Sequence, residues 1–161
     1  MSNYYIERFS KKESCLQVCL DFLYYNFYGG YPPRNQVSKC SSLIDTYRFL
    51  KRNGFSVQCK CHPIFFLNPF LLVMFLISNF KKHGASSKDK LAILTYSSAL
   101  EFYGITDSWN HYVCEIKNEL GWQIYDSYYG FIRTDYPNSQ AIPLTHETIS
   151  KKRAFRFIIW R

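Results

Sequence analysis

The sequence predicts a single α+β domain in which helices come first and an antiparallel sheet follows. Helical periodicity dominates the first half of the 161-residue chain, and short strand-like runs dominate the second half. That order of elements is typical of α+β domains. Hydrophobic residues make up 47% of the chain, which provides enough apolar surface for a compact core. The length suits one domain that covers residues 1–161.

The first predicted helix runs from Ser14 to Tyr28. Its apolar residues recur at steps of three and four, and the glycines and prolines that begin at Gly29 end the pattern. Cys15 lies in the first turn, where unpaired backbone N–H groups and the helix dipole stabilise a thiolate. Cys15 is therefore a candidate nucleophile, and the alternative is an ordinary buried thiol. Cys19, one turn deeper on the same face, is expected in the core.

A second helix is predicted to begin after Ser42. A serine is a favourable N-cap, and Asn53-Gly54 provides a left-handed stop at the other end. The segment from Phe55 to Cys61 then has the character of a strand. The apolar residues on one face of this helix are Leu43, Ile44, Tyr47 and Leu50.

A third helix is predicted over residues 69–82, with Asn68 as its cap and Pro69 at its first position. The residues from Phe70 to Ile77 are apolar around the whole circumference. We expect either a core element or a docking surface for a protein or a membrane face. The apolar run is too short to span a bilayer. The N-terminus has no Sec-type signal, so the sequence predicts a cytoplasmic protein.

Four strands are predicted in the second half of the chain. The first covers Leu91 to Tyr96, and the last covers Arg153 to Trp160. Between them, the strands His111–Lys117 and Trp122–Asp126 flank the turn at residues 118–121 and form a hairpin.

His111 begins one strand of this hairpin and Asp126 ends the other. Because the hairpin returns the chain, we expect both residues at the same edge of the sheet. A thiolate nucleophile needs a nearby base and a group that orients the base. Cys15, His111 and Asp126 therefore form a candidate catalytic triad. The alternatives are a structural histidine at a strand end and a carboxylate in a turn.

Five segments of the chain together form a recognisable pattern. They are Ser14-Cys15-Leu16 through Tyr28-Gly29, Ser42 through Val57, Leu91-Ala-Ile-Leu94, His111-Tyr-Val-Cys114 and Ile124-Tyr-Asp126-Ser127. In these segments the chain resembles the papain-like cysteine peptidases of the C39 and C39-like group, bacterial domains that cut leader peptides after double-glycine motifs. The resemblance covers nearly the whole chain except enlarged stretches at residues 62–90 and 97–108. It implies the papain-like fold, with N-terminal helices packed on an antiparallel sheet, and it places Cys15 as nucleophile.

Two positions depart from the pattern of that family. The glutamine that supplies its oxyanion hole is replaced by Phe9, and the glycine after its cysteine is replaced by Leu16. Other oxyanion donors for this chain are Ser10, Ser14 and the backbone N–H of Cys15.

The leading functional hypothesis is a thiol hydrolase that cleaves a peptide or amide bond of a peptide or protein substrate. A glutamine deamidase or an acyltransferase would use the same triad. The second class is a non-catalytic papain-like module that recognises a leader peptide or a partner protein, and the missing glutamine favours it. The sequence implies no organic cofactor.

The remaining signals are weaker. Cys59, Cys61 and His62 contain metal-ligating groups but lack the paired spacing of a zinc site, so no metal is expected. The six cysteines are interpreted as mostly reduced thiols. The net charge of +8 is interpreted as a solvated basic surface, with a basic groove for an acidic partner as the alternative. No nucleic-acid motif is present, and no nucleic-acid partner is expected.

Overall fold

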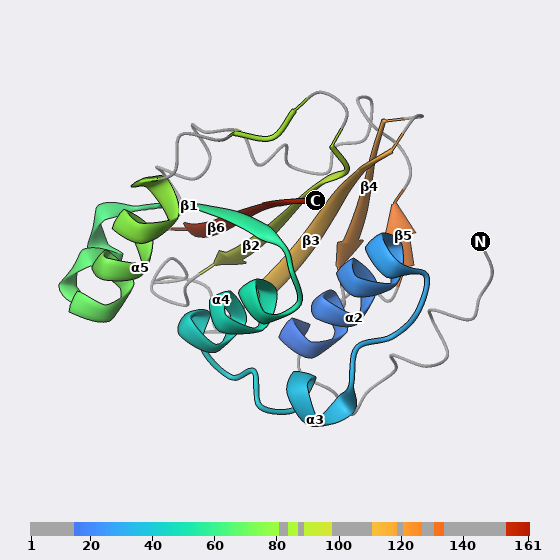
Figure 1. Cartoon of the computed structure of the whole chain (residues 1–161), viewed down its shortest axis with the longest axis horizontal. Helices are drawn as coiled ribbons and strands as arrows, with labels where there is room; N and C mark the ends of the chain where they lie inside the picture. Colours follow the sequence, from blue (N-terminus) through green and yellow to red (C-terminus); the bar gives the residue numbers. More distant parts are fainter. Residues whose placement is uncertain are drawn as a thin grey trace, which may run out of the picture.

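The computed structural model describes residues 15–80, 84–86, 89–97, 111–118, 121–126, 131–133 and 154–161. These residues form a six-stranded antiparallel sheet with helices packed along one of its faces (Figure 1). The α+β class predicted from the sequence is confirmed. The helices are α2 (Cys15–Tyr28), α3 (Arg34–Val37), α4 (Leu43–Arg52), the 3-10 helix η1 (Pro63–Leu67) and α5 (Pro69–Phe80).

The order of strands across the sheet is β1-β6-β2-β3-β4-β5. The last strand of the chain therefore lies between the first two. Cys59 of β1 stands opposite Phe157 of β6, and Phe157 in turn stands opposite Leu94 of β2. The strands are β1 (Ser56–Cys61), β2 (Leu91–Ser97), β3 (His111–Asn118), β4 (Gly121–Asp126), β5 (Phe131–Arg133) and β6 (Ala154–Trp160).

Local signals at its ends explain why α4 begins and ends where it does. The Ser42 side chain accepts a hydrogen bond from the backbone N–H of Asp45, which satisfies one of the unpaired donors of the first turn. Gly54 follows the helix with φ of 79°, a left-handed conformation that glycine adopts without steric cost. The predicted second helix is confirmed at both ends.

An ion pair joins α2 to α3. Asp21 is fully buried, and Arg34 Nη1 donates a hydrogen bond to its Oδ2 at 2.8 Å. A buried carboxylate needs such a partner, because its desolvation is costly. The pair therefore holds the short helix α3 against α2.

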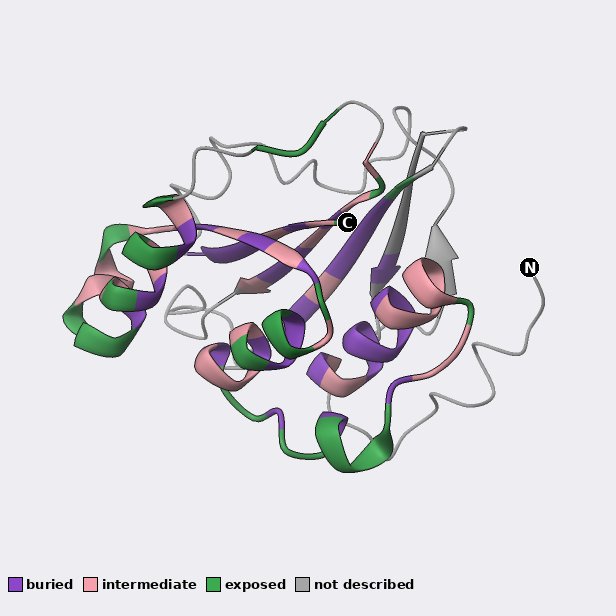
Figure 2. Ribbon diagram, viewed as in Figure 1, coloured by how far each residue is buried: buried purple, intermediate pink, exposed green. Residues whose placement is uncertain are grey.

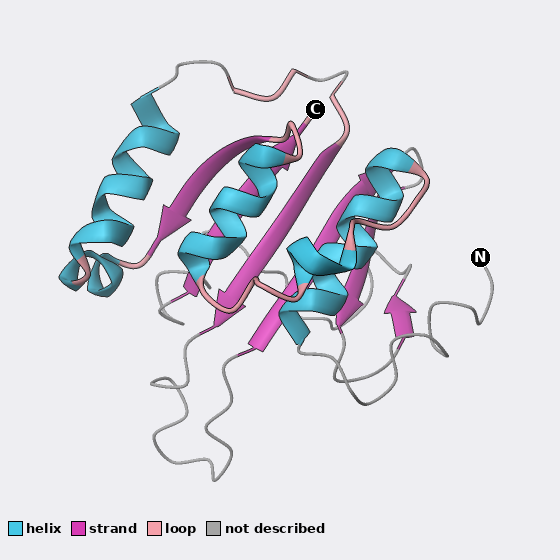
Figure 3. Ribbon diagram, turned by 60° about the horizontal axis from the view of Figure 1, so that its bottom comes forward, coloured by secondary structure: helices cyan, strands magenta, loops and turns pink. Residues whose placement is uncertain are grey.

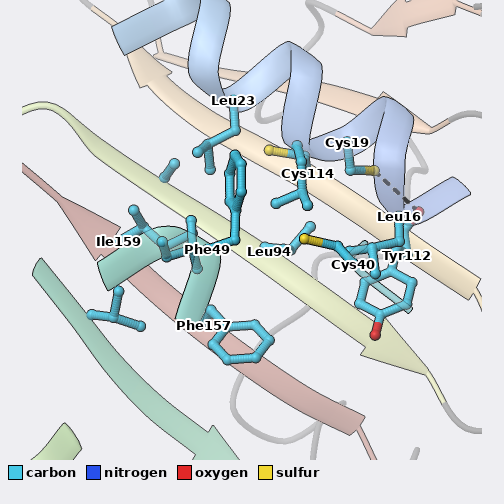
Figure 4. Packing of buried hydrophobic residues seen from close by; sticks show 14 of the residues in the cluster. Leu16, Cys19, Leu23, Cys40, Phe49, Leu94, Tyr112, Cys114, Phe157 and Ile159 are labelled. Atoms are coloured by element: carbon cyan, nitrogen blue, oxygen red, sulfur yellow. Dashed lines mark hydrogen bonds between the residues drawn. The ribbon is translucent and has the colours of Figure 1, made fainter. Parts of the chain in front are cut away.

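The core lies between the helices and the sheet face that they cover (Figures 2 and 4). Apolar side chains from α2 and α4 meet alternate residues of β2, β3 and β6 there. Phe22 and Phe49 fill the space between the two layers, and Cys19 is fully buried, as the sequence predicts. The largest fully buried side chains are Phe22, Phe55, Phe155, Phe157, Leu20, Leu23, Leu50, Leu94, Ile116 and Ile159.

The third predicted helix is also confirmed as α5, with the Asn68 side chain accepting from the backbone N–H of Phe70 at 3.0 Å. Its predicted end at Lys82 lies outside the described residues. The predicted strands correspond to β1, β2, β3, β4 and β6, and their ends agree within one residue. The short elements α3, η1 and β5 were not predicted from the sequence. No helix in the described part of the chain combines the length and apolar character that a bilayer span needs.

Candidate active site

Helix α2 crosses the sheet so that Cys15 lies towards the start of β3. The Cys19 thiol donates a hydrogen bond to the backbone carbonyl of Tyr112 at 3.5 Å. Farther along the helix, the Phe22 ring stacks on Tyr125 of β4 with ring centroids 4.9 Å apart. Cys15 is the first residue of α2, one turn before Cys19, and it is half-buried. These two contacts set the position of the candidate nucleophile relative to the sheet.

Two tyrosines from neighbouring strands interact electrostatically with Cys15. Tyr96 and Tyr112 stand directly opposite each other in the register of β2 and β3, and their ring centroids are 4.9 Å apart. Burial raises the pKa of Tyr96, and the negative charge of a Cys15 thiolate raises it further. Burial also raises the pKa of Tyr112, with Tyr96 and Cys15 as additional causes. The thiol group of Cys15 is thus within electrostatic range of both phenols.

The backbone brings the positions of His111 and Asp126 to one end of the sheet. His111 is the first residue of β3 and pairs with Ser97, whereas Asp126 is the last residue of β4 and pairs with Val113. Asp126 therefore stands opposite a residue two positions from His111. The hairpin predicted from the sequence is present, and the side chains of His111 and Asp126 lie outside the described residues.

The two faces of β3 have different surroundings. Tyr112, Cys114 and Ile116 are buried and belong to the core beneath α2. Successive side chains of a strand point to opposite faces, so Val113 and Glu115 belong to the face away from α2.

The face away from α2 carries a buried polar group that sequence reasoning missed. Glu115 and Arg156 are only 8% and 7% exposed, and Thr95 is fully buried directly opposite Arg156. Burial raises the pKa of Glu115, and the positive charge of Arg156 opposes that shift. The available signal was Arg156, the one charged residue within the otherwise apolar run of β6, and Glu115, which lies between Cys114 and Ile116 in β3.

The remaining cysteines are structural thiols. Burial raises the pKa of Cys59 to about 12 and of Cys61 to about 11. Burial, together with the nearby charge of Asp45, raises the pKa of Cys40 to about 11. Cys114 is fully buried, and its pKa is also raised by burial. A raised pKa keeps a thiol protonated, so these groups are poor nucleophiles at neutral pH.

The segment Cys59, Cys61 and His62 has a structural role in the fold. His62 Nδ1 accepts a hydrogen bond from the backbone N–H of Ile64 and thereby caps η1. Cys59 lies in the core beneath α5. Within the described ranges, no group of three or more His, Cys, Asp or Glu side chains could hold a metal ion.

Of the candidate oxyanion donors, the backbone N–H of Cys15 lies within the described residues, at the first position of α2. Phe9, Ser10 and Ser14 lie outside the described residues, and Leu16 is buried in the core.

Comparisons of the chain with protein-family models, curated proteins and solved structures find no match.

Proposed function

We propose that the chain is a papain-like thiol hydrolase that cleaves a peptide or amide bond, with Cys15, His111 and Asp126 as its triad. The observation that carries this proposal is the hydrogen bond between Cys19 and the carbonyl of Tyr112. It ties the first turns of α2 to the start of β3, so that Cys15 lies at the same end of the sheet as His111 and Asp126. A Cys-His-Asp triad requires at least this, that its three positions meet at one end of the sheet.

The reaction would proceed by acyl transfer to the thiol. His111 accepts the proton of Cys15, and the thiolate attacks the carbonyl carbon of the substrate to form a C–S bond. The C–N bond then breaks, and the imidazolium gives its proton to the leaving amine. Water, deprotonated by His111, hydrolyses the thioester to release the acid and the free thiol. Asp126 orients the imidazole and stabilises its charged form.

The proposal makes a specific demand on His111. Val113 and Glu115, the positions in phase with it along β3, belong to the face away from α2. The imidazole must therefore reach the thiol around the end of the strand, where His111 is the first residue. If it does not, the second candidate applies, and the domain is a papain-like module that binds a leader peptide or partner protein without cutting it.

The rate at which iodoacetamide alkylates each cysteine between about pH 5 and pH 8 tests the triad, because alkylation reports the thiolate fraction. Cys59 and Cys61 are internal references: with pKa values of about 12 and about 11, about a thousandth or less of each is ionised at pH 8. Mass spectrometry locates the modified sites. We expect Cys15 to react selectively and well below pH 8.

Three variants test whether the reactivity of Cys15 depends on the proposed base and on the carboxylate that orients it. His111→Ala should abolish the reactivity of Cys15 at low pH, and Asp126→Asn should reduce it, whereas His83→Ala, which removes a histidine that the triad does not use, should leave it unchanged. The catalytic proposal fails if Cys15 in the wild type is as inert as the buried Cys19. The binding-module candidate would then take its place, and a peptide-binding assay would replace a search for a cleaved bond.

A further inference from the structure

The outward side of η1 and α5 is an exposed apolar surface, here called the outer α5 face. Its six large hydrophobic side chains are between 45% and 84% exposed, and they are the exposed large hydrophobic residues of the described chain. α5 itself contains no charged residue. On soluble proteins, a large exposed apolar surface usually marks a site that binds another protein or a membrane. The residues are Leu67, Phe70, Val73, Leu76, Ile77 and Phe80.

The opposite side of α5 is anchored to the sheet, so the outer α5 face is held in one orientation. Leu71, Met74 and Ser78 are the buried residues of this helix. The Ser78 hydroxyl accepts from the backbone N–H of Cys59 at 3.0 Å, and Asn79 Nδ2 donates to the Cys59 carbonyl at 3.0 Å. The helix cannot rotate its apolar face inward without losing these bonds.

Most of the net charge of the chain lies in the stretch of sequence that includes this surface. The segment from Thr46 to Lys88 contains seven Lys and Arg residues and no Asp or Glu. The whole chain has a net charge of +8. It holds most of α4 together with β1, η1 and α5. The basic residues of the segment are Arg48, Lys51, Arg52, Lys60, Lys81, Lys82 and Lys88.

Four of these basic residues lie in the described structure, and all four are exposed. Arg48, Lys51 and Arg52 lie on α4, and Lys60 lies on β1. α5 lies along the edge of the sheet beside β1, and α4 is its neighbour on the helical side (Figure 3). The outer α5 face is therefore flanked by positive charge on both neighbouring elements.

We propose that the outer α5 face docks on the surface of an anionic lipid membrane. Aliphatic and aromatic side chains on one face of a helix partition into the boundary between headgroups and acyl chains, and flanking Lys and Arg bind anionic headgroups. At 12 residues the helix is about 18 Å long, so it lies in the plane of the interface rather than across it. This proposal does not depend on the chemistry of Cys15.

The test is co-sedimentation of the full chain with vesicles of phosphatidylcholine alone and of phosphatidylcholine with about one third phosphatidylglycerol. We expect binding to the anionic vesicles that is at least tenfold stronger than to the neutral ones and that weakens with salt. The double variant Phe70→Ser/Phe80→Ser should weaken this binding at least tenfold. Circular dichroism verifies that the variant remains folded, as expected for two exposed positions.

Two matched charge reversals test the electrostatic part. Lys60→Glu lies inside the acid-free segment and should weaken binding to anionic vesicles by several-fold, whereas Lys117→Glu, an exposed lysine on β3, should have a much smaller effect. Equal binding to both kinds of vesicle, or none to either, overturns the proposal. It is also overturned if light scattering shows a dimer that Phe70→Ser/Phe80→Ser dissociates, because the outer α5 face would then pair with a second copy.

Discussion

The hydroxyl of Ser78 accepts a hydrogen bond from the backbone N–H of Cys59 at 3.0 Å, across the outer edge of β1. β1 is a terminal strand of the sheet, and an open edge exposes backbone groups to pairing with other chains. The other outward backbone group of Cys59, its carbonyl, accepts a hydrogen bond from the Asn79 side chain. Helix α5 therefore closes this edge with side-chain hydrogen bonds to Cys59, on the side of β1 that faces away from β6.

Substitution of Ser78 by alanine should destabilise the protein by about 1–3 kcal/mol, because it leaves the buried N–H of Cys59 without an acceptor. Ser78 itself is only 7% exposed, so water cannot readily replace the hydroxyl. Urea unfolding measures the loss. Ser56→Ala, on the same strand but half-buried, is the control and should change the free energy of unfolding by about 0.5 kcal/mol or less. Equal effects of the two substitutions would contradict the role assigned to Ser78.

The N-cap of α4 gives a prediction that depends on pH. Ser42 Oγ accepts from the backbone N–H of Asp45 and donates to the carboxylate Oδ2 at 2.8 Å. The hydrogen bond from Ser42 is the largest cause of the lowered pKa of Asp45. A folded-state pKa below the ordinary value of 3.8 stabilises the fold above that pH, and the stabilisation is lost as the pH falls through the lowered value.

Ser42→Ala should therefore cost about 1 kcal/mol at about pH 7, and the difference from the wild type should shrink on acidification below about pH 4. Unfolding by urea at a series of pH values measures both effects. Ser41→Ala is the matched control, since Ser41 reaches the same carboxylate oxygen at the longer distance of 3.3 Å. A cost that stays constant with pH would show that the contact with the carboxylate contributes nothing.

Glu115 should make the protein less stable as the pH rises. Burial raises its pKa above the ordinary value of 4.5, in spite of the nearby Arg156. The folded state then holds the proton at pH values where the unfolded state has released it, so stability falls from about pH 4.5 up through the raised folded pKa. Glu115→Gln stays neutral and should remove this slope. Urea unfolding across that range tests it, and parallel curves for the variant and the wild type would contradict it.

The sequence was sufficient for elements whose ends carry local signals. Ser42 and Gly54 mark the two ends of α4 through capping and a positive φ, and both are legible in the sequence. The position of β6 between β1 and β2 has no such local signal, because it is set by pairing with residues far away in the sequence, such as Ser56 with Trp160 and Leu91 with Trp160. The five-residue η1 and the three-residue β5 are shorter than the stretch of sequence in which a helical or strand periodicity can be recognised.

The candidate site also has features that local sequence signals predict and features that depend on tertiary pairing. The start of α2 at Cys15 and the hairpin that joins His111 to Asp126 follow from periodicity and turn residues. The tyrosine pair that interacts electrostatically with Cys15 could not be predicted, since Tyr96 and Tyr112 meet only through the register of β2 on β3. The orientation of α5 was also beyond the sequence. A helix that is apolar on all sides has no polar stripe to show which face turns outward.

The contact between Phe22 and Tyr125 holds α2 on the sheet and should be among the most sensitive to substitution. Phe22 is fully buried, whereas Phe80 is 82% exposed, so Phe→Ala at the two sites compares the same chemical change in opposite surroundings. Phe22→Ala should cost about 3–5 kcal/mol, because it removes apolar contacts and leaves a cavity beside Tyr125. Phe80→Ala should cost about 0.5 kcal/mol or less. Urea unfolding of both variants tests the packing of α2 directly. A small loss at Phe22 would show that α2 is held mainly by its other contacts, and the position of Cys15 at the end of the sheet would then depend chiefly on Cys19 and its bond to Tyr112.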